Sequence, residues 1–567
     1  MKLFRVLAAL IFLFLTANFL LSFYSWFPSG IVVRSLVPIP EALLLLWVLL
    51  VIAVFVPGPG TNPGTRGRKI LALVGAGTIV GVMIGFSLAE ALFQWIYARS
   101  FVPRMDIPAI RSLLLLYLGD IGSLVGLLTP PAIAVLFLLF IGLGIGLVWA
   151  SVRLLTRSVD GDPRKRRGAI VSLAVMTVVS VPFFFLAPPP KSLAAHTLVS
   201  WTESGRGEFY DIEVAEAPGD AQSEARTADE AELPAYQFPG ILDRDIYLFT
   251  IEAYGYAAHS RPELAGQLEP SFRRLEGVLE EKGYTVLTSY LRSPVAGGFS
   301  WLAEATFFTG QWIDSQARFE QLYGADLPTL PGMLQRGGYY TMSVRPGTVH
   351  GAWPEGWDIY RLEESLTAYD GAFDFVGPWF SYVPVTDQFA IWTAHRRITE
   401  VSGPGEAAEG RPLFVHFQLV SSHTPFNRIP PYIEDWTDLG DGSIYVERSD
   451  EIRTYDNSWT GGTELEEGYV DAQSYVFRVI TDYIDRHMAL EDNPIIVIFG
   501  DHQAQRPIRE REATLSVPIH VATRDPKIAE AFRREGYQPG MTSDQPPPHP
   551  EMSVFFPFFA RVAVDDF

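Results

Sequence analysis

The chain of 567 residues contains no cysteine. A disulfide framework, a thiolate metal site and a cysteine nucleophile are therefore excluded. Charged residues are also scarce, at 19%, whereas 48% of the residues are hydrophobic. So apolar a composition excludes an intrinsically disordered chain, and the length indicates more than one domain.

Charge is divided very unevenly along the chain. Residues 1–195 contain 16 Lys and Arg against 6 Asp and Glu, a net charge of +10. The remaining residues contain 28 Lys and Arg against 58 Asp and Glu, a net charge of −30. Nucleic-acid binding requires a basic face, so we expect no nucleic-acid partner for the acidic part.

Five apolar runs in the first third are each long enough to cross about 30 Å of hydrocarbon: 6–27, 40–57, 70–97, 131–155 and 169–187. A signal peptide would be a single short run followed by a cleavage site. We therefore expect residues 1–190 to form a transmembrane region of about five helices.

A further segment, Ser112–Leu128, leaves the number of spans open. It is apolar but contains Asp120, and Pro130-Pro131 follows it, so it could be a half-helix or an interfacial helix. With five spans, all the basic clusters share one side, which the positive-inside rule makes cytoplasmic. The N-terminus is then inside, and everything after about residue 190 is outside. The clusters are Lys2 and Arg5; Arg66, Arg68 and Lys69; and Arg153, Arg157, Arg164, Lys165, Arg166 and Arg167.

Residues 191–240 have the composition of an exposed linker, and residues 241–567 that of a globular domain. Within this domain β-favouring apolar runs alternate with helix-like stretches, which predicts an α/β/α sandwich with a mainly parallel sheet. The expected strands are 245–251, 284–289, 339–344, 413–420 and 495–499. The expected helices are 270–282, 327–336 and 469–490.

Titratable residues follow three of these strands. Glu252 follows the first, His423 follows the run LFVHFQLV, and Asp501 and His502 follow IIVIF across a glycine. Ligands of open α/β sheets bind beyond the carboxyl ends of the strands, so we expect these residues at one edge. Glu, Asp and His together are suitable ligands for Mn²⁺, Mg²⁺ or Zn²⁺.

Other histidines carry a different expectation. His416 lies within a strand-like run and is expected to be a hydrogen-bonded core residue, and His520 also reads as part of a strand.

A candidate nucleophile lies in the segment VAGGFSWLAEATFFTG (295–310). Ser300 begins the helix-like part, where backbone N–H groups and the helix dipole favour a developing negative charge. A nearby metal would lower the pKa of the hydroxyl. The alternative is that Ser300 is only the N-cap of this helix.

Taken together, these motifs resemble the alkaline phosphatase/sulfatase superfamily, above all the lipoteichoic acid synthase group of phosphoglycerol and phosphoethanolamine transferases. The resemblance spans about 260 residues and has the family's order. It rests on DIYLFTIEAYG (245–255), GGFSWLAE (297–304), GMLQRGGYYT (332–341), FVHFQLVSSHTPF (414–426) and VIFGDHQ (497–503).

The resemblance implies a role for each site residue. Glu252, Asp501 and His502 would be metal ligands, and Ser300 would be both nucleophile and ligand. His423 would contact the substrate phosphate, and Arg345 would lie in a substrate-binding region. The formylglycine signal of true sulfatases is absent after Ser300, and we find no second Asp/His set for a two-metal site.

The implied activity is a manganese-dependent transfer of a phosphorylated head group from a phospholipid to a glycan or glycolipid, through a covalent Ser300 intermediate. Magnesium or zinc could replace manganese. The alternatives are a phosphodiesterase, phosphatase or sulfatase-like hydrolase with the same ligands, and a non-catalytic membrane-tethered binding module. The resemblance also implies a multi-pass protein of a bacterial inner or plasma membrane with its catalytic domain periplasmic or extracellular.

Overall fold

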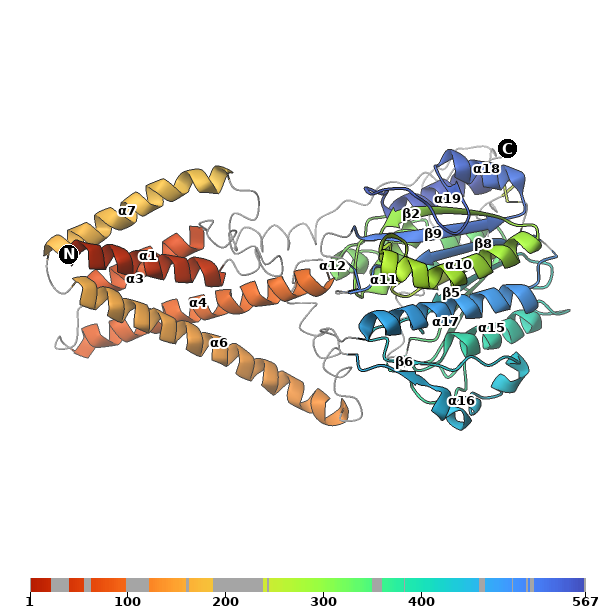
Figure 1. Ribbon diagram of the computed structural model, residues 1–567, viewed down its shortest axis with the longest axis horizontal. Coiled ribbons are helices and arrows are strands. Elements are labelled where there is room, and N and C mark those ends of the chain that lie inside the picture. Colours follow the sequence, from red (N-terminus) through yellow and green to blue (C-terminus); the bar gives the residue numbers. More distant parts are fainter. Residues whose placement is uncertain are drawn as a thin grey trace. The chain divides into compact units, whose positions relative to one another are not determined.

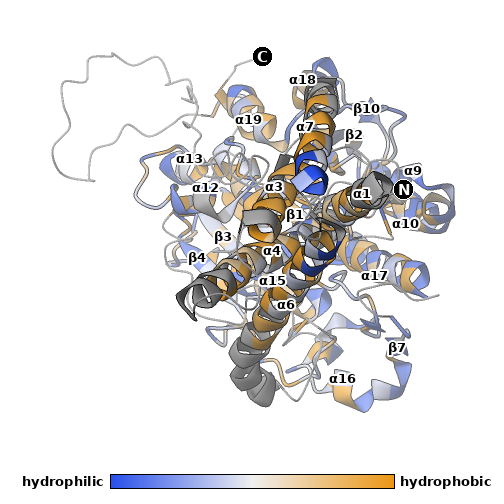
Figure 2. Cartoon of the chain, turned by 90° about the vertical axis from the view of Figure 1, so that its left-hand side faces the viewer, coloured by the Kyte–Doolittle hydropathy of each residue, from blue (hydrophilic) through white to orange (hydrophobic). Residues whose placement is uncertain are grey.

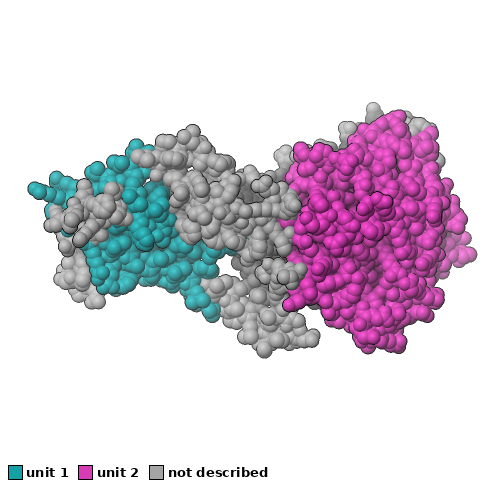
Figure 3. All heavy atoms as spheres, in the orientation of Figure 1, with its two compact units in different colours: residues 1–205 teal, residues 206–567 magenta. Residues whose placement is uncertain are grey.

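The structure is a computed structural model, and its contacts divide the chain into two units, residues 1–205 and 206–567 (Figure 3). The expected linker, 191–240, lies outside the described residues up to 237, as does the part 112–121 of the ambiguous apolar segment. The described residues are 2–21, 40–55, 63–97, 122–159, 163–186, 238–241, 244–348, 359–381, 383–457, 464–491, 493–505, 508–509 and 514–564.

Each of the five apolar runs coincides with a helix of the first unit (Figure 1). Two of them contain segments long and apolar enough to cross a membrane, Ile70–Ala91 and Leu138–Arg157, and Ala42–Ala53 is a shorter apolar helix. That these five helices span a membrane stays a prediction. The helices are α1 (Lys2–Leu21), α3 (Pro40–Phe55), α4 (Pro63–Tyr97), α6 (Gly122–Val159) and α7 (Pro163–Leu186).

The outer faces of these helices are apolar. Leu71, Leu139 and Val178 are 73%, 64% and 70% exposed, and Figure 2 shows hydrophobic colour along the helices. Apolar side chains on so much of the outer surface suit a lipid surrounding better than water. Inside, α4 and α6 are in close contact: a Cβ at Gly144 would lie 2.1 Å from the carbonyl oxygen of Gly77. Such small-residue contacts are typical of helices packed in membranes.

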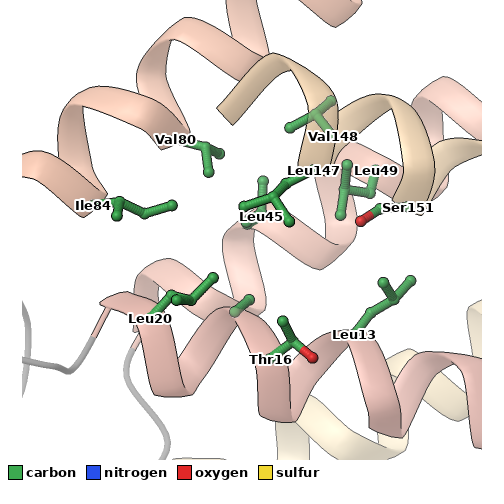
Figure 4. A pocket seen from close by; sticks show the side chains of 11 residues that line it. Leu13, Thr16, Leu20, Leu45, Leu49, Val80, Ile84, Leu147, Val148 and Ser151 are labelled. Carbon is green, nitrogen blue, oxygen red and sulfur yellow. The ribbon is translucent and has the colours of Figure 1, made fainter. Parts of the chain in front are cut away.

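Side chains of α1, α3, α4 and α6 also surround a pocket (Figure 4). Its lining is apolar except for the hydroxyls of Thr16 and Ser151.

The ends of these helices are arranged as the charge pattern requires. The starts of α1, α4 and α7 and the end of α6 lie at one end of the unit, at the left in Figure 1. These are the segments that contain the basic clusters. The clusters therefore share one side of the unit, and its assignment to the cytoplasm stays a prediction.

The second unit is built on an eight-stranded sheet of order β10-β2-β9-β8-β1-β5-β3-β4. The strands from β8 to β4 pair in parallel, whereas β9 is antiparallel to β8 and to β2, and β10 is antiparallel to β2. The sheet is therefore mixed, and the expected parallel order holds only for its part from β8 to β4. The strands are β1 (Ile246–Ile251), β2 (Thr285–Arg292), β3 (Tyr340–Arg345), β4 (Glu364–Thr367), β5 (Leu413–Leu419), β8 (Ile495–Gly500), β9 (Ser516–Thr523) and β10 (Gln538–Pro539).

Helices cover both faces of the sheet, because the strands alternate their side chains between two cores. On β1, Tyr247 and Phe249 join the core beneath α10, α15 and α17, and Leu248 joins the core beneath α11, α13, α18 and α19. The expected α/β/α sandwich is confirmed. The main helices are α10 (Pro262–Glu281), α11 (Ser300–Thr309), α13 (Leu330–Arg336), α15 (Asp387–Val401), α17 (Leu465–Arg486), α18 (Pro526–Arg534) and α19 (Phe555–Val564). Short elements are α9 (Ala257–Ser260), α12 (Gln316–Glu320), α16 (Ile444–Glu447), η3 (Trp436–Leu439), η4 (Ser449–Glu451), η5 (Met552–Val554) and the pair β6 (Arg428–Ile429) with β7 (Arg453–Thr454).

The start of one expected helix is wrong by eight residues. The helix expected to begin at Pro270 begins at Pro262, and Pro270 lies inside it. A proline within a helix removes one backbone hydrogen bond. Here that loss is offset by one continuous apolar face, formed by Leu264, Leu268, Phe272, Leu275 and Leu279, all of them buried.

The chain is very closely packed where β8 ends. A Cβ at Gly500 would lie 1.8 Å from the carbonyl oxygen of Tyr254. We expect Gly500→Ala to lower the free energy of unfolding by about 3 kcal/mol or more, because backbone cannot yield as a flexible side chain does. The matched control is Gly266→Ala in α10, where no atom lies within 4 Å of the added Cβ. It should raise that free energy by up to about 1 kcal/mol. Urea unfolding measures both changes in free energy, and equal effects of the two substitutions would contradict the close packing at Gly500.

Candidate functional site

The residues predicted at the strand ends come together at one edge of the sheet. Ile251 at the end of β1 lies opposite Leu419 of β5 and Gly500 of β8 in the parallel register. The residues that follow, Glu252 and Asp501, are therefore neighbours. Sequence reasoning placed them at this edge, and the pairing of β8 with β1 makes them adjacent.

Glu252, Asp501 and His502 form a compact, buried cluster. Their candidate ligand atoms all lie within 4.8 Å of one another, and the three residues are at most 6% exposed. His502 Nε2 lies 3.2 Å from Glu252 Oε1 and 3.5 Å from Asp501 Oδ2. Among the described residues this is the group of histidine and acidic side chains that could hold a metal ion.

Hydrogen bonds orient each member of the cluster. Asp501 Oδ1 accepts the backbone N–H groups of Ala253, at 2.9 Å, and of His502, at 2.6 Å, so that Oδ2 faces the cluster. His502 Nδ1 lies 3.0 Å from the carbonyl oxygen of Gln503. A carbonyl only accepts, so Nδ1 carries a hydrogen and Nε2 is the nitrogen that faces the cluster, where a cation would take the place of its proton.

The backbone of Glu252 is held from two further elements. Its carbonyl oxygen accepts Ser422 Oγ at 2.7 Å and Gln473 Nε2, from α17, at 3.1 Å. Sequence reasoning missed Ser422 and Gln473, because a serine in a loop and a glutamine in a helix carry no signal of such contacts.

The cluster shifts the pKa of each member. Burial, and then the charge of Glu252, raises the pKa of Asp501 to about 8. Burial lowers the pKa of His502, but the two carboxylates outweigh burial and raise it to about 9. Burial raises the pKa of Glu252, but the charges of His502 and His423 outweigh it and lower it to about 2. The cluster therefore retains protons near neutral pH that a cation would displace.

Ser300 reaches the cluster from a sharply turned segment. Gly297, Gly298 and Phe299 all have positive φ, at 69°, 137° and 67°, and Ser300 is then the first residue of α11. The helix has no side-chain cap at its N-terminus. Instead Ser300 Oγ donates to Glu252 Oε2 at 2.9 Å and lies 3.3 Å from His502 Nε2. The hydroxyl thus points into the cluster rather than capping the helix.

His423 lies in the loop after β5 and is half-buried. Its charge acts on Glu252, as the lowered pKa of that carboxyl shows. His423 Nδ1 lies 2.6 Å from the carbonyl oxygen of Thr424, so Nδ1 carries a hydrogen and Nε2 is the nitrogen that can take or give a proton.

The loop of His423 is held by a residue that the sequence did not single out. Asp387, the first residue of α15, accepts the backbone N–H of Val420 at 2.8 Å and of Ser421 at 2.9 Å. Burial raises the pKa of Asp387 to about 7. The only available signal was the Thr386-Asp387 pair, which is typical of a helix start.

Arg345 lies at the end of β3, where both its guanidinium and its partner Glu304 are 1% exposed. The two side chains form a buried ion pair beneath α11. The substrate-binding role expected for Arg345 stays a prediction.

The donor set fits a divalent cation. Two carboxylates, one imidazole with Nε2 directed inward and one hydroxyl meet in a buried space, and each is oriented by the protein. Oxygen and imidazole ligands suit Mn²⁺, Mg²⁺ and Zn²⁺. Two buried carboxylates with one imidazole also leave negative charge that a cation would neutralise.

No protein-family model and no curated protein matches the chain. Among the solved structures that it matches is the lipoteichoic acid synthase LtaP from Listeria monocytogenes, at 16% identity and a TM-score of 0.32, over 50% of this chain and 66% of that one. Another is the lipooligosaccharide phosphoethanolamine transferase A from Neisseria meningitidis, at 11% and 0.44, over 98% and 95%. A third is the phosphoglycerol transferase GacH from Streptococcus pyogenes, at 11% and 0.34, over 57% and 86%.

The matches include the superfamily and the transferases that the sequence motifs resemble. At these identities and TM-scores we draw no functional conclusion from them, and the function is inferred from the geometry of the site.

Metal affinity should depend steeply on pH. A cation must displace protons held by Asp501 and His502, whose pKa values are raised to about 8 and about 9. We expect the Kd for Mn²⁺, measured by calorimetry on the full chain, to fall continuously from pH 6 to pH 9. Asp501→Asn keeps the size of the side chain but should weaken binding more than about 100-fold. An equal Kd at pH 6 and pH 9 would contradict the proposed ligands.

The same pKa values predict the stability of the metal-free protein. A folded-state pKa above the unfolded value stabilises the fold below the unfolded pKa, and this contribution is lost as pH rises through the folded pKa. The contribution of Asp501 is therefore lost as pH rises from about 4 to about 8, and that of His502 from about 6.5 to about 9. The Tm of the metal-free chain should fall over this range, and Mn²⁺ should restore most of the lost Tm at pH 9.

Proposed function

We propose that the protein is a metal-dependent, membrane-anchored transferase. It moves a phosphorylated head group, phosphoglycerol or phosphoethanolamine, from a phospholipid to a hydroxyl of a glycan or glycolipid. The observation that carries this proposal is the Ser300 hydroxyl, which begins a helix and points at Glu252 and His502 inside a buried set of cation ligands. A serine in such a place suits nucleophilic attack on phosphorus.

The geometry also supports the need for a cation. The carboxylate that accepts the Ser300 hydrogen bond is Glu252, whose pKa is lowered to about 2. A general base works best with a pKa near the operating pH, so Glu252 is a poor base for a serine. A divalent cation at the cluster, manganese in our proposal, would lower the pKa of the hydroxyl and withdraw charge from the phosphoryl group.

The reaction proceeds in two displacements. Ser300 releases its proton to solvent and its Oγ forms a bond to phosphorus, while the bond from phosphorus to the glycerol oxygen of diacylglycerol breaks. His423 Nε2 gives a proton to that leaving oxygen. An acceptor hydroxyl then gives its proton back to His423 and bonds to phosphorus, and Ser300 Oγ leaves and is reprotonated from solvent. Atoms and protons balance over the cycle.

The helical unit suits a lipid donor. Two of its helices are long and apolar enough to cross a membrane, and tethering a catalytic domain there raises the effective concentration of a donor that stays in the bilayer. The basic clusters share one end of the unit. We therefore propose that this end faces the cytoplasm, in a bacterial inner or plasma membrane, and that the catalytic domain lies on the other side of the membrane.

Covalent chemistry on Ser300 can be tested by intact mass. The full chain in detergent, with Mn²⁺ and either phosphatidylglycerol or phosphatidylethanolamine, is quenched in acid. We expect an added mass equal to the phosphorylated head group of one lipid on the wild type, because a phosphate ester on serine survives acid. Ser300→Ala should form none, whereas Ser300→Thr, which keeps a hydroxyl, should still form it more slowly.

The acceptor separates the alternatives. Adding a glycolipid to the adduct should discharge it onto the glycan, whereas discharge at an equal rate in water alone would identify a hydrolase. An adduct on Ser300→Ala, or no adduct while Mn²⁺ is bound and diacylglycerol is released, would overturn the Ser300 intermediate.

Topology can be tested directly because the chain has no cysteine. We expect a membrane-impermeant maleimide to label Arg273→Cys in intact spheroplasts, because this exposed residue lies in the catalytic domain. The exposed Arg164→Cys, at the start of α7, should be labelled only after the membrane is opened. The reverse pattern would place the catalytic domain in the cytoplasm.

A further inference from the structure

A buried ion pair lies between the nucleophile helix and the sheet. Arg345 Nη1 donates to Glu304 Oε2 at 3.0 Å, and Nη2 donates to Glu304 Oε1, so the contact is a two-pronged fork. Gln418 Nε2, from β5, donates to the same Oε2 at 3.3 Å. Glu304 is the fifth residue of α11, four positions after Ser300, and these positions lie on one face of a helix.

A chain of hydrogen bonds leads from Arg345 to β1, the strand that Glu252 follows. Arg345 Nε donates to Ser343 Oγ at 2.9 Å, and Ser343 Oγ lies 3.2 Å from His416 Nδ1. His416 Nε2 lies 2.9 Å from Thr250 Oγ1, and Thr250 is two residues before Glu252. All four side chains are buried. As the sequence predicted, His416 is a hydrogen-bonded core residue.

The hydrogen-bond donors and acceptors along this path are compatible with one another. Burial lowers the pKa of His416 well below its ordinary value, with a further contribution from the charge of Arg345, so its ring is neutral. Ser343 Oγ accepts from Arg345 and still has its own hydrogen to donate to Nδ1, which leaves Nε2–H to donate to Thr250. With His416 in this tautomer, every contact along the path has one donor and one acceptor.

The apolar contacts of α11 lack such direction. Phe307 stacks on Phe499 and on Phe555 at centroid distances of 4.1 and 4.3 Å, and Phe308 meets the ring of His416 edge-on. Apolar packing stabilises the helix against the sheet but is not directional. A buried ion pair adds little net stability over an apolar pair, although breaking it by removing one partner is costly. Its fork geometry therefore fixes position more than it adds stability.

We propose that Arg345 and Glu304 are positioning residues, which hold α11 on β3 and β5 so that Ser300 Oγ stays directed at the cation ligands. This rests on the proposed function of Ser300. It differs from the substrate-binding role that the resemblance implies for Arg345, because Arg345 would act through Glu304 rather than on the substrate.

The test uses the full chain with three changes. Arg345→Lys keeps the positive charge but loses the two-pronged contact, and Glu304→Gln removes the negative charge. The double variant Glu304→Met with Arg345→Met keeps side chains of similar size but removes both charges and the two-pronged contact. At saturating lipid we expect the rate of Ser300 adduct formation to fall about 100-fold in each, because an Ångström of misplacement has effects of that order. The Kd for Mn²⁺ and the KM for lipid should stay within about twofold.

The matched control is Asp525→Asn, which weakens the part-buried ion pair of Arg244 with Asp525 at the start of α18. It should lower Tm without changing the rate of adduct formation. The double methionine variant should have a higher Tm than Glu304→Gln, which leaves Arg345 without its charged partner, and should still react slowly. A parallel rate loss in Asp525→Asn, or recovery of the rate together with Tm, would reduce the fork to a structural role and overturn the proposal.

Two other outcomes also overturn it. A raised KM with an unchanged rate at saturation would assign Arg345 to substrate binding, and a weakened Kd for Mn²⁺ would assign the fork to the metal ligands. Amide hydrogen exchange of α11 keeps the test independent of the proposed function. If the wild type forms no adduct, the proposed function fails, but loss of α11 protection in Arg345→Lys and not in Asp525→Asn still supports the positioning role. Unchanged protection contradicts it.

Discussion

Two buried carboxylates, Glu252 and Asp501, are held next to each other by the parallel pairing of β1 with β8. Like charges at this separation in a low dielectric repel strongly, and the repulsion appears in the raised pKa of Asp501. Neighbouring groups offset this repulsion. Two backbone N–H groups donate to Asp501 Oδ1, and the imidazole of His502 lies between the carboxylates. A divalent cation would complete the compensation, and this links the fold to the proposed chemistry.

The proposed nucleophile, Ser300, comes to this centre from a different part of the chain, so its placement is a separate problem. Backbone with positive φ before Ser300 directs the hydroxyl inward, and the ion pair one turn later anchors the helix to the sheet. Rigid elements thus hold both the proposed ligands and the proposed attacking oxygen, as preorganised catalysis requires. The apolar surface of the helical unit complements this arrangement, because it suits a bilayer in which a lipid donor is confined.

Much of the fold could be predicted from local pattern. The runs at 245–251, 413–420 and 495–499 form β1, β5 and β8 nearly as expected, because strands buried on both faces read as continuous apolar sequence. The start of α10 could not, because a proline inside a helix opposes local preference and the buried leucine face outweighs it. The antiparallel β9 could not either, because strand direction depends on which neighbour a strand meets rather than on its composition.

Short-range pattern in the sequence was enough to single out Glu252, Asp501, His502 and Ser300 as candidates, because each stands where a strand ends or a helix begins. That the Ser300 hydroxyl points at Glu252 instead of capping its helix, and that Arg345 meets Glu304 in the interior, depends on how the chain folds as a whole. Those contacts join positions about 40 to 50 residues apart in sequence, and their geometry depends on sheet order, helix rotation and burial. None of these is encoded in any local window of sequence.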